Sequence, residues 1–368
     1  MTVTQLEIQL VALVVAVACA LPGVFLVLRR MAMMSDAISH TVLLGIVIGF
    51  FLTRSLDSPL LVLGAAAMGV LTVSLVELLN RTGLVKEDAA IGLVFPALFS
   101  IAVILISRFA RGVHLDVDAV LLGELAFAPF DRITFLGVDM PKSLAVMGGI
   151  LVINIVFIVL FYKELKLSTF DAGLAAAFGF SPALIHYGLM TLVSITAVGA
   201  FDAVGSILVV ALMVTPAATA YLLTDDLRRM LLLSALIGGL SAVGGYWLAR
   251  TLDANIAGSI ATVTGLVFLA VLLFAPSRGL VAIASRRRRQ RWEFAQAMLL
   301  IHLLHHESKP EATLENRTDH LLEHIRWSPS FAEQVIRYGE RHGTLRRRAG
   351  TLLLTDSGRT LARSSMIE

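Results

Sequence analysis

Long apolar runs separated by short polar breaks occupy the chain as far as about Pro276. Nine of these runs are near the ~20 residues that an α-helix needs to cross a bilayer. The seventh contains Thr215-Pro216 and should be kinked, because proline removes a helical hydrogen bond. The pattern predicts an all-α polytopic membrane protein with about nine transmembrane helices, eight being the alternative. The predicted spans are about 8–28, 35–53, 59–79, 90–107, 143–161, 181–199, 203–222, 231–249 and 257–275.

The pattern changes abruptly after the last span, where charged residues and histidines replace the apolar runs. Helical periodicity predicts three helices over about 292–307, 313–326 and 329–342. The segment from Gly343 to Thr355 reads as two strands joined at Ala349-Gly350, and Asp356 begins a last helix. Three helices and a hairpin make a winged helix-turn-helix. The expected domains are a transmembrane domain at 1–280, a basic juxtamembrane linker at 281–291 and a cytoplasmic winged-helix-like domain at 292–368.

Composition and charge support a membrane protein and give its orientation. Of the 368 residues, 57% are hydrophobic, and the mean hydropathy is +0.83. The single cysteine, Cys19, excludes an internal disulfide and a cysteine metal cluster. The first run lacks a basic start and a clear cleavage site, so we expect a retained helix. Lysine and arginine in short loops place the N-terminus outside and the tail in the cytoplasm, in a multi-pass protein of the cell membrane.

The expected cytoplasmic basic residues lie in short loops and directly after the last span. The group at 286–289 is also suited to contact anionic lipid headgroups. The full set is Arg29, Arg30, Arg81, Lys86, Lys163, Lys166, Arg228, Arg229 and 286–289.

The stretch from Met33 to Gly45 holds an aspartate and a histidine four residues apart. Residues i and i+4 share one face of a helix, so Asp36 and His40 should lie together. A carboxylate and an imidazole suit a borderline divalent cation such as Mn²⁺, Zn²⁺ or Fe²⁺. Ionisable residues at membrane depth are costly and mark functional sites. The alternative is a helix that starts near Ser35, with Asp36 at its solvated end and His40 in a helix contact.

This stretch resembles the signature of the permease subunits of bacterial ABC importers for manganese, zinc and iron. The family pattern is Gly/Ser-Asp-Ala-Leu/Ile-Ser-His, then small and apolar residues and a glycine. It matches Ser35-Asp36-Ala37-Ile38-Ser39-His40 and Gly45. The resemblance covers about residues 8–275. It implies that Asp36 and His40 of two permeases converge on the pathway as a transient metal site, since a tight site would trap its cargo.

A second match to the same family is the run from Val204 to Ala220, a Val-Gly-x-Leu-Leu-Val pattern that ends in Pro-Ala-Ala-x-Ala. Gly205 and the alanines permit close helix approach. Pro216 frees a carbonyl group that is a candidate to line a pathway. The alternative for Gly45, Gly205 and Pro216 alike is a role in helix packing.

The segment from Lys166 to Gly179 is too polar to span a membrane. It predicts a short helix from Asp171 to Phe178, with Gly179 as its C-terminal cap. Small residues such as Ala175 would let this helix dock closely in the groove of a partner. It resembles the coupling helix of ABC importers, which contacts the cytoplasmic ATPase. The alternative is an ordinary amphipathic connector.

The long loop between the fourth and fifth predicted spans is acidic, and it resembles the family's Asp-x-x-x-x-Leu-x-Gly element. Its candidates for an extracytoplasmic mouth that attracts metal are His114, Asp116, Asp118 and Glu124. The alternative is a solvated loop that faces a binding-protein partner. The part from Ile133 to Lys142 exceeds what the family pattern requires.

The resemblance implies a permease dimer, formed with a second copy or a sister chain, together with two ATPase subunits and an extracytoplasmic metal-binding protein. The divalent metal is the substrate, and no permanently bound cofactor is expected. The sequence has no Gly-x-x-x-x-Gly-Lys-Ser/Thr phosphate loop, so the chain is not an enzyme and ATP hydrolysis requires a separate subunit. Two other functions stay open: a proton-coupled secondary metal transporter and a membrane-tethered metal sensor. The ligand types do not select among Mn, Zn and Fe.

The tail resembles another known class. The ending from Leu354 to Ala362 resembles winged-helix regulators, and some of these permeases carry a tail that resembles metal-dependent repressors of the diphtheria-toxin-repressor type. DNA binding would use Arg337, Arg341 and Arg346 to Arg348. Since the domain is tethered close to the membrane, we expect a packing or regulatory role and no DNA partner.

Four histidines of the tail form two pairs at helical i, i+4 spacing. Either pair is a candidate metal site that would make the tail a sensor. Solvated helix faces are the alternative. The pairs are His302 with His306 and His320 with His324.

Overall fold

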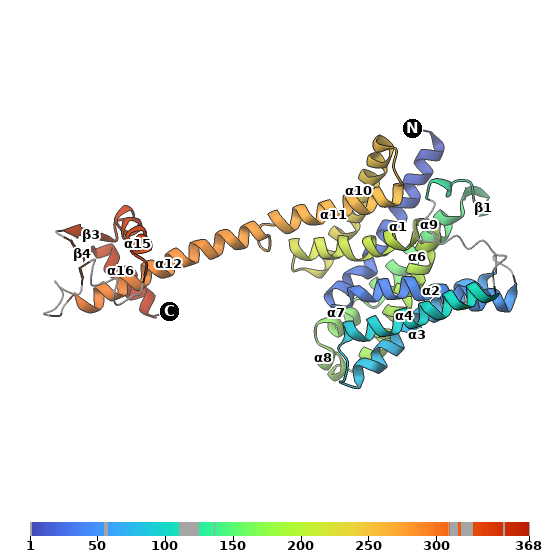
Figure 1. The fold of residues 1–368 in the computed structure, drawn as a ribbon, viewed down its shortest axis with the longest axis horizontal. Coiled ribbons are helices and arrows are strands. Elements are labelled where there is room, and N and C mark those ends of the chain that lie inside the picture. The colour runs from blue at the N-terminus through green and yellow to red at the C-terminus, as the bar shows by residue number, and fades with distance from the viewer. Residues whose placement is uncertain are drawn as a thin grey trace. The chain divides into compact units, whose positions relative to one another are not determined.

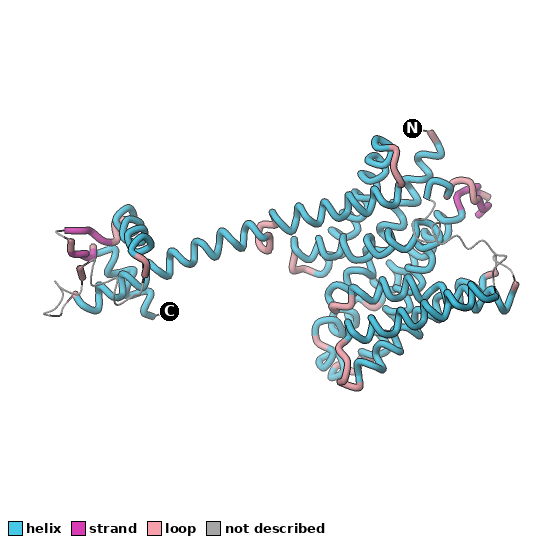
Figure 2. The backbone as a smooth tube through the Cα atoms, in the orientation of Figure 1, coloured by secondary structure: helices cyan, strands magenta, loops and turns pink. Residues whose placement is uncertain are grey.

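The computed structural model describes residues 2–54, 58–109, 125–135, 137–307, 309, 316–317, 327–348 and 350–367. Within these residues the chain is almost entirely helical, and its strands form two short hairpins (Figures 1 and 2). The chain divides into two compact units, Met1–Gly279 and Leu280–Glu368. They are called the membrane unit and the C-terminal unit below.

Eight helices of the membrane unit are long and apolar enough to cross a membrane, counted over the described residues. They are α1 (Val3–Leu28), α2 (Ala32–Thr53), α3 (Pro59–Arg81), α4 (Glu87–Phe109), α6 (Lys142–Leu160), α9 (Pro182–Leu223), α10 (Leu227–Leu252) and α11 (Ile256–Phe274). The short helices α7 (Tyr162–Phe170) and α8 (Ala172–Ala177) lie between α6 and α9. The spans predicted at 181–199 and 203–222 both fall in the 42-residue α9, so eight helices, the alternative number, carry the nine predicted spans.

The long helix α9 turns back on itself at Gly205, whose φ of 77° and ψ of 163° suit glycine and few other residues. Near the beginning of α9, His186 contacts Arg29, which also binds α7. Just beyond its end, the Arg228 guanidinium lies 5.5 Å from the ring centre of Tyr162, the first residue of α7. A straight helix of this length would separate its ends by about 60 Å. Both ends can lie beside α7 only because the chain reverses direction within α9.

The core of the membrane unit is built around α1, which packs against α6, α9 and α10. Small residues let these helices approach closely. A Cβ atom added at Gly23 would lie 1.8 Å from the carbonyl oxygen of Met213. The buried Asn154 of α6 donates to the carbonyl oxygen of Ala18 at 2.8 Å and to Thr196 Oγ1 at 3.0 Å. One amide group therefore joins α1, α6 and α9 inside the apolar core.

A short hairpin precedes α6 and accounts for the extra part of the predicted loop. After the 3₁₀ turn η1 (Leu125–Phe127), strand β1 (Arg132–Phe135) pairs antiparallel with β2 (Val138–Pro141). Arg132 donates to Asp139 across the hairpin at 2.7 Å and to Glu7 of α1 at 3.1 Å. These ion pairs fasten the hairpin to the N-terminal end of α1.

The C-terminal unit contains α12 (Leu280–His306), α15 (Pro329–Arg341), the hairpin of β3 (Leu345–Arg348) and β4 (Thr351–Leu354), and α16 (Asp356–Ile367). The predicted hairpin and last helix are confirmed. The segment 281–291, predicted as a basic juxtamembrane linker, is helical and forms part of α12, since alanine and arginine favour helix. The helix predicted over 313–326 lies almost wholly outside the described residues. The structure therefore establishes a small helical region with a hairpin, not a winged helix-turn-helix.

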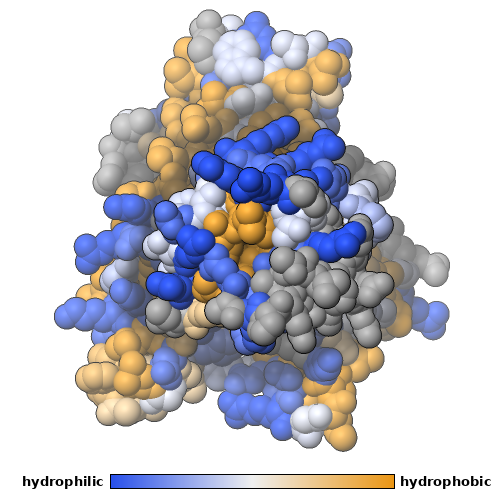
Figure 3. All heavy atoms as spheres, turned by 90° about the vertical axis from the view of Figure 1, so that its left-hand side faces the viewer, coloured by the Kyte–Doolittle hydropathy of each residue, from blue (hydrophilic) through white to orange (hydrophobic). Residues whose placement is uncertain are grey.

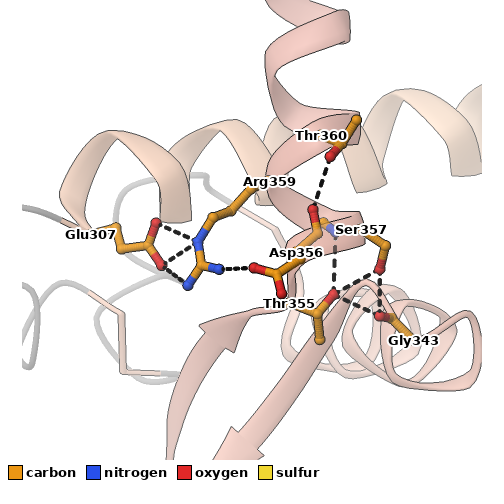
Figure 4. Close-up of polar contacts among 8 residues, drawn as sticks. Glu307, Gly343, Thr355, Asp356, Ser357, Arg359 and Thr360 are labelled. Atoms are coloured by element: carbon orange, nitrogen blue, oxygen red, sulfur yellow. Dashed lines mark hydrogen bonds and ion pairs between the residues drawn. The ribbon is translucent and has the colours of Figure 1, made fainter.

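Polar contacts join the hairpin, α12 and α16 of the C-terminal unit (Figure 4). Thr355 and Ser357 both donate through their hydroxyls to the carbonyl oxygen of Gly343, at 2.7 and 2.9 Å. Arg359 of α16 binds both carboxylate oxygens of Glu307, just after α12. The same unit has an apolar core, formed by α12, α15, both strands and Ala362 of α16. On the face drawn in Figure 3, hydrophilic side chains gather around a small hydrophobic area.

Candidate functional site

The helix that carries the Asp-His motif begins earlier than predicted. The N-cap of α2 is Met31, and its first residue is Ala32. Asp36 therefore lies within the second turn, not at the solvated end of a helix that starts near Ser35. The hydroxyl of Ser35 donates to the carbonyl oxygen of Ala32, and that of Ser39 donates to Ser35, both at 2.8 Å. Both serine hydroxyls therefore donate their hydrogen bonds within α2.

The structure brings Asp36 and His40 together on one face of α2. His40 Nε2 lies 3.5 Å from Asp36 Oδ1, as the i, i+4 spacing predicts. The His40 side chain is 28% exposed and the Asp36 side chain 35% exposed, whereas Ala37, Ile38 and Ser39 between them are buried. Both groups thus lie on a side of α2 that the rest of this chain leaves partly open.

Two aromatic residues of α4 hold the imidazole of His40. Its ring stacks on Phe95, with ring centres 5.5 Å apart and planes 30° apart. Phe99, one turn further along α4, meets the ring edge-on at 5.7 Å. Stacked and edge-on contacts of this kind stabilise the position of the ring. The polar contact of the imidazole is made at its edge, where Nε2 faces Asp36.

Removing these rings should weaken metal capture. In the double variant Phe95→Ala/Phe99→Ala we expect the apparent affinity for metal uptake to fall about two- to tenfold, the value of roughly 0.5–1.5 kcal/mol for an aromatic contact. The measurement is the concentration dependence of uptake. The matched control is Phe109→Ala, which removes a ring from the same helix that pairs with Phe51 of α2 and not with His40. An equal loss in the control would exclude a specific role for the His40 contact.

The described residues of one chain bring two candidate metal ligands together at α2. No group of three or more His, Cys, Asp and Glu able to hold a metal ion occurs among the described residues. Protein sites for Zn²⁺ usually have four ligands, and Asp36 with His40 gives two. The mouth residues expected from the sequence, His114, Asp116, Asp118 and Glu124, lie outside the described residues.

The short helix predicted before α9 is confirmed. Asp171 ends α7 and caps α8, its Oδ1 accepting from the Leu174 backbone N–H at 2.8 Å. Gly179 follows α8 with φ of 84°, in the left-handed region that glycine prefers. Ala175 is fully buried within the membrane unit, whereas Leu174 and Phe178 are exposed. The face of α8 that is open to a partner is therefore apolar and excludes Ala175.

The remaining motif residues lie in close helix contacts. A Cβ atom added at Gly45 of α2 would lie 2.3 Å from the carbonyl oxygen of Gly64 in α3. Gly205 forms the turn within α9. Pro216 is buried in α9, and a Cβ atom added at Gly238 of α10 would lie 3.6 Å from its Cγ atom.

The tail histidines are only partly described. His302 and His306 of α12 lie with ring centres 4.7 Å apart. His320 and His324 lie outside the described residues.

A cluster of polar residues at the α7 end of the membrane unit was not assigned a role from the sequence. Arg29 binds Ser168 and Thr169 of α7 and His186 of α9. Burial lowers the pKa of Arg29 to about 10, so the guanidinium stays protonated at neutral pH. The Arg29-Arg30 pair before the α2 motif was the available signal, but local pattern says nothing about partners some 140 residues away.

The neighbouring contact joins α3 and α9. The hydroxyl of Tyr187 donates to Glu77 Oε2 at 2.5 Å, and Arg81 binds the other carboxylate oxygen of Glu77. A cavity of about 210 Å³ lies beside this cluster, lined by Met31, Met34, Val73, Val76, Glu77, Asn80 and His186.

Comparison with known proteins places the membrane unit in a family. The chain is 49% identical to the zinc transport system membrane protein TroD of Treponema pallidum over 98% of both chains. It is 51% identical to the manganese transport system membrane protein MntD of Bacillus subtilis, over 73% of this chain and 90% of that one. Among solved structures it is similar to PsaBC from Streptococcus pneumoniae in complex with Fab. That match has a TM-score of 0.64 and 29% identity, and it covers 76% of this chain and 94% of that chain.

The family match agrees with the division into two units. It extends over residues 4–275 and so leaves the C-terminal unit outside it. The spans, the Asp-His motif of α2 and the short helix α8 all lie within the matched residues. The chain belongs to the ABC 3 transport family.

Proposed function

We propose that this chain is the transmembrane permease subunit of an ATP-driven importer of divalent metal ions. Relatives named for zinc and manganese transport support this class of cargo, and a third is named for chelated iron transport. The chain is a transporter subunit and not an enzyme, so ATP is hydrolysed on a separate subunit. Manganese, zinc and iron all remain suitable, since carboxylate and imidazole ligands accept each of them.

The observation that carries this proposal is the pairing of Asp36 and His40 on a partly open face of α2. Two such faces, from this chain and a second permease, would supply two carboxylates and two imidazoles. Four ligands shared between two subunits can separate when the subunits move. That geometry suits a site that binds an ion briefly and releases it.

Two surfaces of the membrane unit are suited to contact the partner proteins of an importer. The exposed apolar residues of α8, Leu174 and Phe178, support docking of that helix in a groove of the ATPase. The hairpin of β1 and β2 and the acidic residues that precede it in the sequence are suited to face an extracytoplasmic metal-binding protein. The second permease is either another copy of this chain or a sister chain.

The charge distribution supports an orientation with α7, α8 and the C-terminal unit in the cytoplasm. Arg29, Arg228 and Arg278 gather near the ends of α9. Basic residues of short loops stay on the cytoplasmic side. Since α9 begins and ends on this side, its two legs make two crossings and place the N-terminus outside. Arg286 to Arg289 then lie where anionic headgroups are within reach.

For the C-terminal unit we propose a regulatory role in a winged-helix-like domain, with the histidines of α12 as a candidate metal sensor. Ion pairs support this choice over DNA binding. Arg347 donates to Glu333 at 2.7 Å and lies 3.9 Å from Glu340, and Arg337 also pairs with Glu333. The hydrogen bond from Arg347 lowers the pKa of Glu333, which keeps this carboxylate ionised beside the candidate DNA-binding residues.

The test is transport by the assembled importer in proteoliposomes, with Mn²⁺, Zn²⁺ and Fe²⁺ supplied one at a time. We expect uptake of at least one metal, and this uptake should require ATP. The ATP must be supplied on the side of the vesicle membrane that the ATPase faces. Collapse of the proton gradient should leave this uptake unchanged. Uptake that ignores ATP and stops with the gradient would identify a proton-coupled transporter instead. Deletion of 290–368 should leave measurable transport. A membrane-tethered sensor would instead lose its function when this tail is removed.

A further inference from the structure

Arg29 joins three elements that lie far apart in the sequence. It is the C-cap of α1, and its side chain donates in three directions. Nη2 binds Ser168 Oγ at 2.9 Å, Nε binds Thr169 Oγ1 at 3.1 Å, and Nη1 lies 3.2 Å from His186 Nδ1. The end of α1, the last turn of α7 and the first turns of α9 therefore meet at one guanidinium.

On one side, this contact leads directly to the helix proposed to dock on the ATPase. Thr169 lies two residues before Asp171, which is both the end of α7 and the cap of α8. No flexible loop separates the hydroxyls from α8. A displacement of α8 must therefore move the two acceptors of Arg29 or break their hydrogen bonds.

On the other side, the contact leads directly to the metal motif. Arg30 follows with φ of 63°, in the left-handed region, and Met31 then caps α2. A connection this short has few backbone dihedral angles that could absorb a displacement. Asp36 lies within the second turn of the helix that starts there. Movement of Arg29 is thus passed to the N-terminal end of α2.

A second route reaches the same helix through α3. Tyr187, next to His186 in α9, binds Glu77 of α3. In turn α3 packs on α2 with the backbones in contact at Gly45 and Gly64. The first turns of α9 therefore contact α3, and through α3 they are connected to α2, which carries the Asp-His motif.

The acceptors around Arg29 are two hydroxyls and an imidazole, all uncharged when the imidazole is neutral. Hydrogen bonds to neutral acceptors are weaker than those to carboxylates. They can break and form again during a cycle, which a buried ion pair resists. The arrangement therefore suits a contact that changes between states.

We propose that Arg29 is a positioning residue that transmits movement of the coupling helix α8 to the metal-binding helix α2. The inference rests on the proposed function as an ATP-driven importer. Arg29 does not touch the metal. Its loss should separate ATP hydrolysis from transport and leave the two metal ligands intact.

The test uses the whole importer in proteoliposomes and measures metal ions transported per ATP hydrolysed. In Arg29→Gln we expect ATP hydrolysis to continue while this ratio falls about two- to thirtyfold, the range for loss of coupling between sites. The matched control is Arg278→Gln, another arginine of the membrane unit, which binds the Tyr221 carbonyl oxygen and Asp225 and not α7. Its ratio should equal that of the unmodified protein.

A second variant covers the case in which Arg29→Gln does not fold. Ser168→Ala/Thr169→Val removes the hydroxyl acceptors and keeps Arg29, and it should lower the same ratio. Parallel loss of hydrolysis and uptake, with the ratio unchanged in either variant, would overturn the inference and leave a purely structural role. Absence of ATP-driven transport in the unmodified importer would instead overturn the proposed function.

Discussion

Alanine at either Asp36 or His40 is expected to reduce metal uptake by at least about tenfold. Loss of an outer-shell partner alone typically lowers metal affinity or activity 10–100-fold, and these side chains are proposed as direct ligands. His40→Ala leaves the Asp36 carboxylate in place, and Asp36→Ala removes the only carboxylate within ion-pair distance of His40 among the described contacts. The double variant should lose little more than either single variant, because residues that act as a unit are not additive.

The measurement is elemental analysis of cells starved of Mn, Zn and Fe and then supplied with each metal. The variants must be compared at equal expression in the presence of the partner subunits. The matched control is Met33→Ala, an exposed residue three positions before Asp36 on the same helix. Selective loss of one metal in both variants would also identify the cargo. Unchanged uptake of every metal would remove both residues from the mechanism.

The parts of the molecule that follow from local rules could be predicted from the sequence. Helix periodicity alone places Asp36 and His40 together, and the structure gives 3.5 Å between their polar atoms. The capping residues Asp171 and Gly179 define α8 to within a residue of its observed ends. The turn at Gly350 likewise separates the two strands of the C-terminal hairpin. In each case the determining contacts lie within a few residues of one another.

Features that depend on distant parts of the chain could not be predicted in this way. Gly205 belongs to a family motif, but hydropathy does not reveal that the chain reverses there with no loop between its two helical legs. The burial of Ala175 depends on what α8 packs against, and small residues alone suggested the opposite face. Arg29 read only as a charge in a short loop. Its three acceptors come from α7 and α9, which the fold brings to the end of α1.

Alanine at Gly45 is expected to destabilise the membrane unit by about 1–3 kcal/mol, the usual effect of overpacking a tight core. The added Cβ atom would lie 2.3 Å from the Gly64 carbonyl oxygen and 2.7 Å from the Ala65 Cα atom. Both are backbone atoms, so α2 and α3 must separate. Since α2 carries Asp36 and His40, uptake should fall together with stability. The measurement is thermal unfolding of the purified protein in detergent, beside uptake at equal expression.

The control for this prediction is Gly265→Ala in α11, where the new methyl group would meet no atom within 4 Å. Alanine also favours helix over glycine, so this control should be neutral or slightly stabilising. Gly64→Ala tests the same contact from the other helix, because its Cβ atom would lie 2.7 Å from the Gly45 carbonyl oxygen. If the helices separate in either single variant, the double variant should lose less than the sum of the two, since the first methyl group already opens the space for the second. Strict additivity of Gly45→Ala and Gly64→Ala, or equal effects at Gly45 and Gly265, would show that close contact between α2 and α3 does not determine the position of the helix that carries Asp36 and His40.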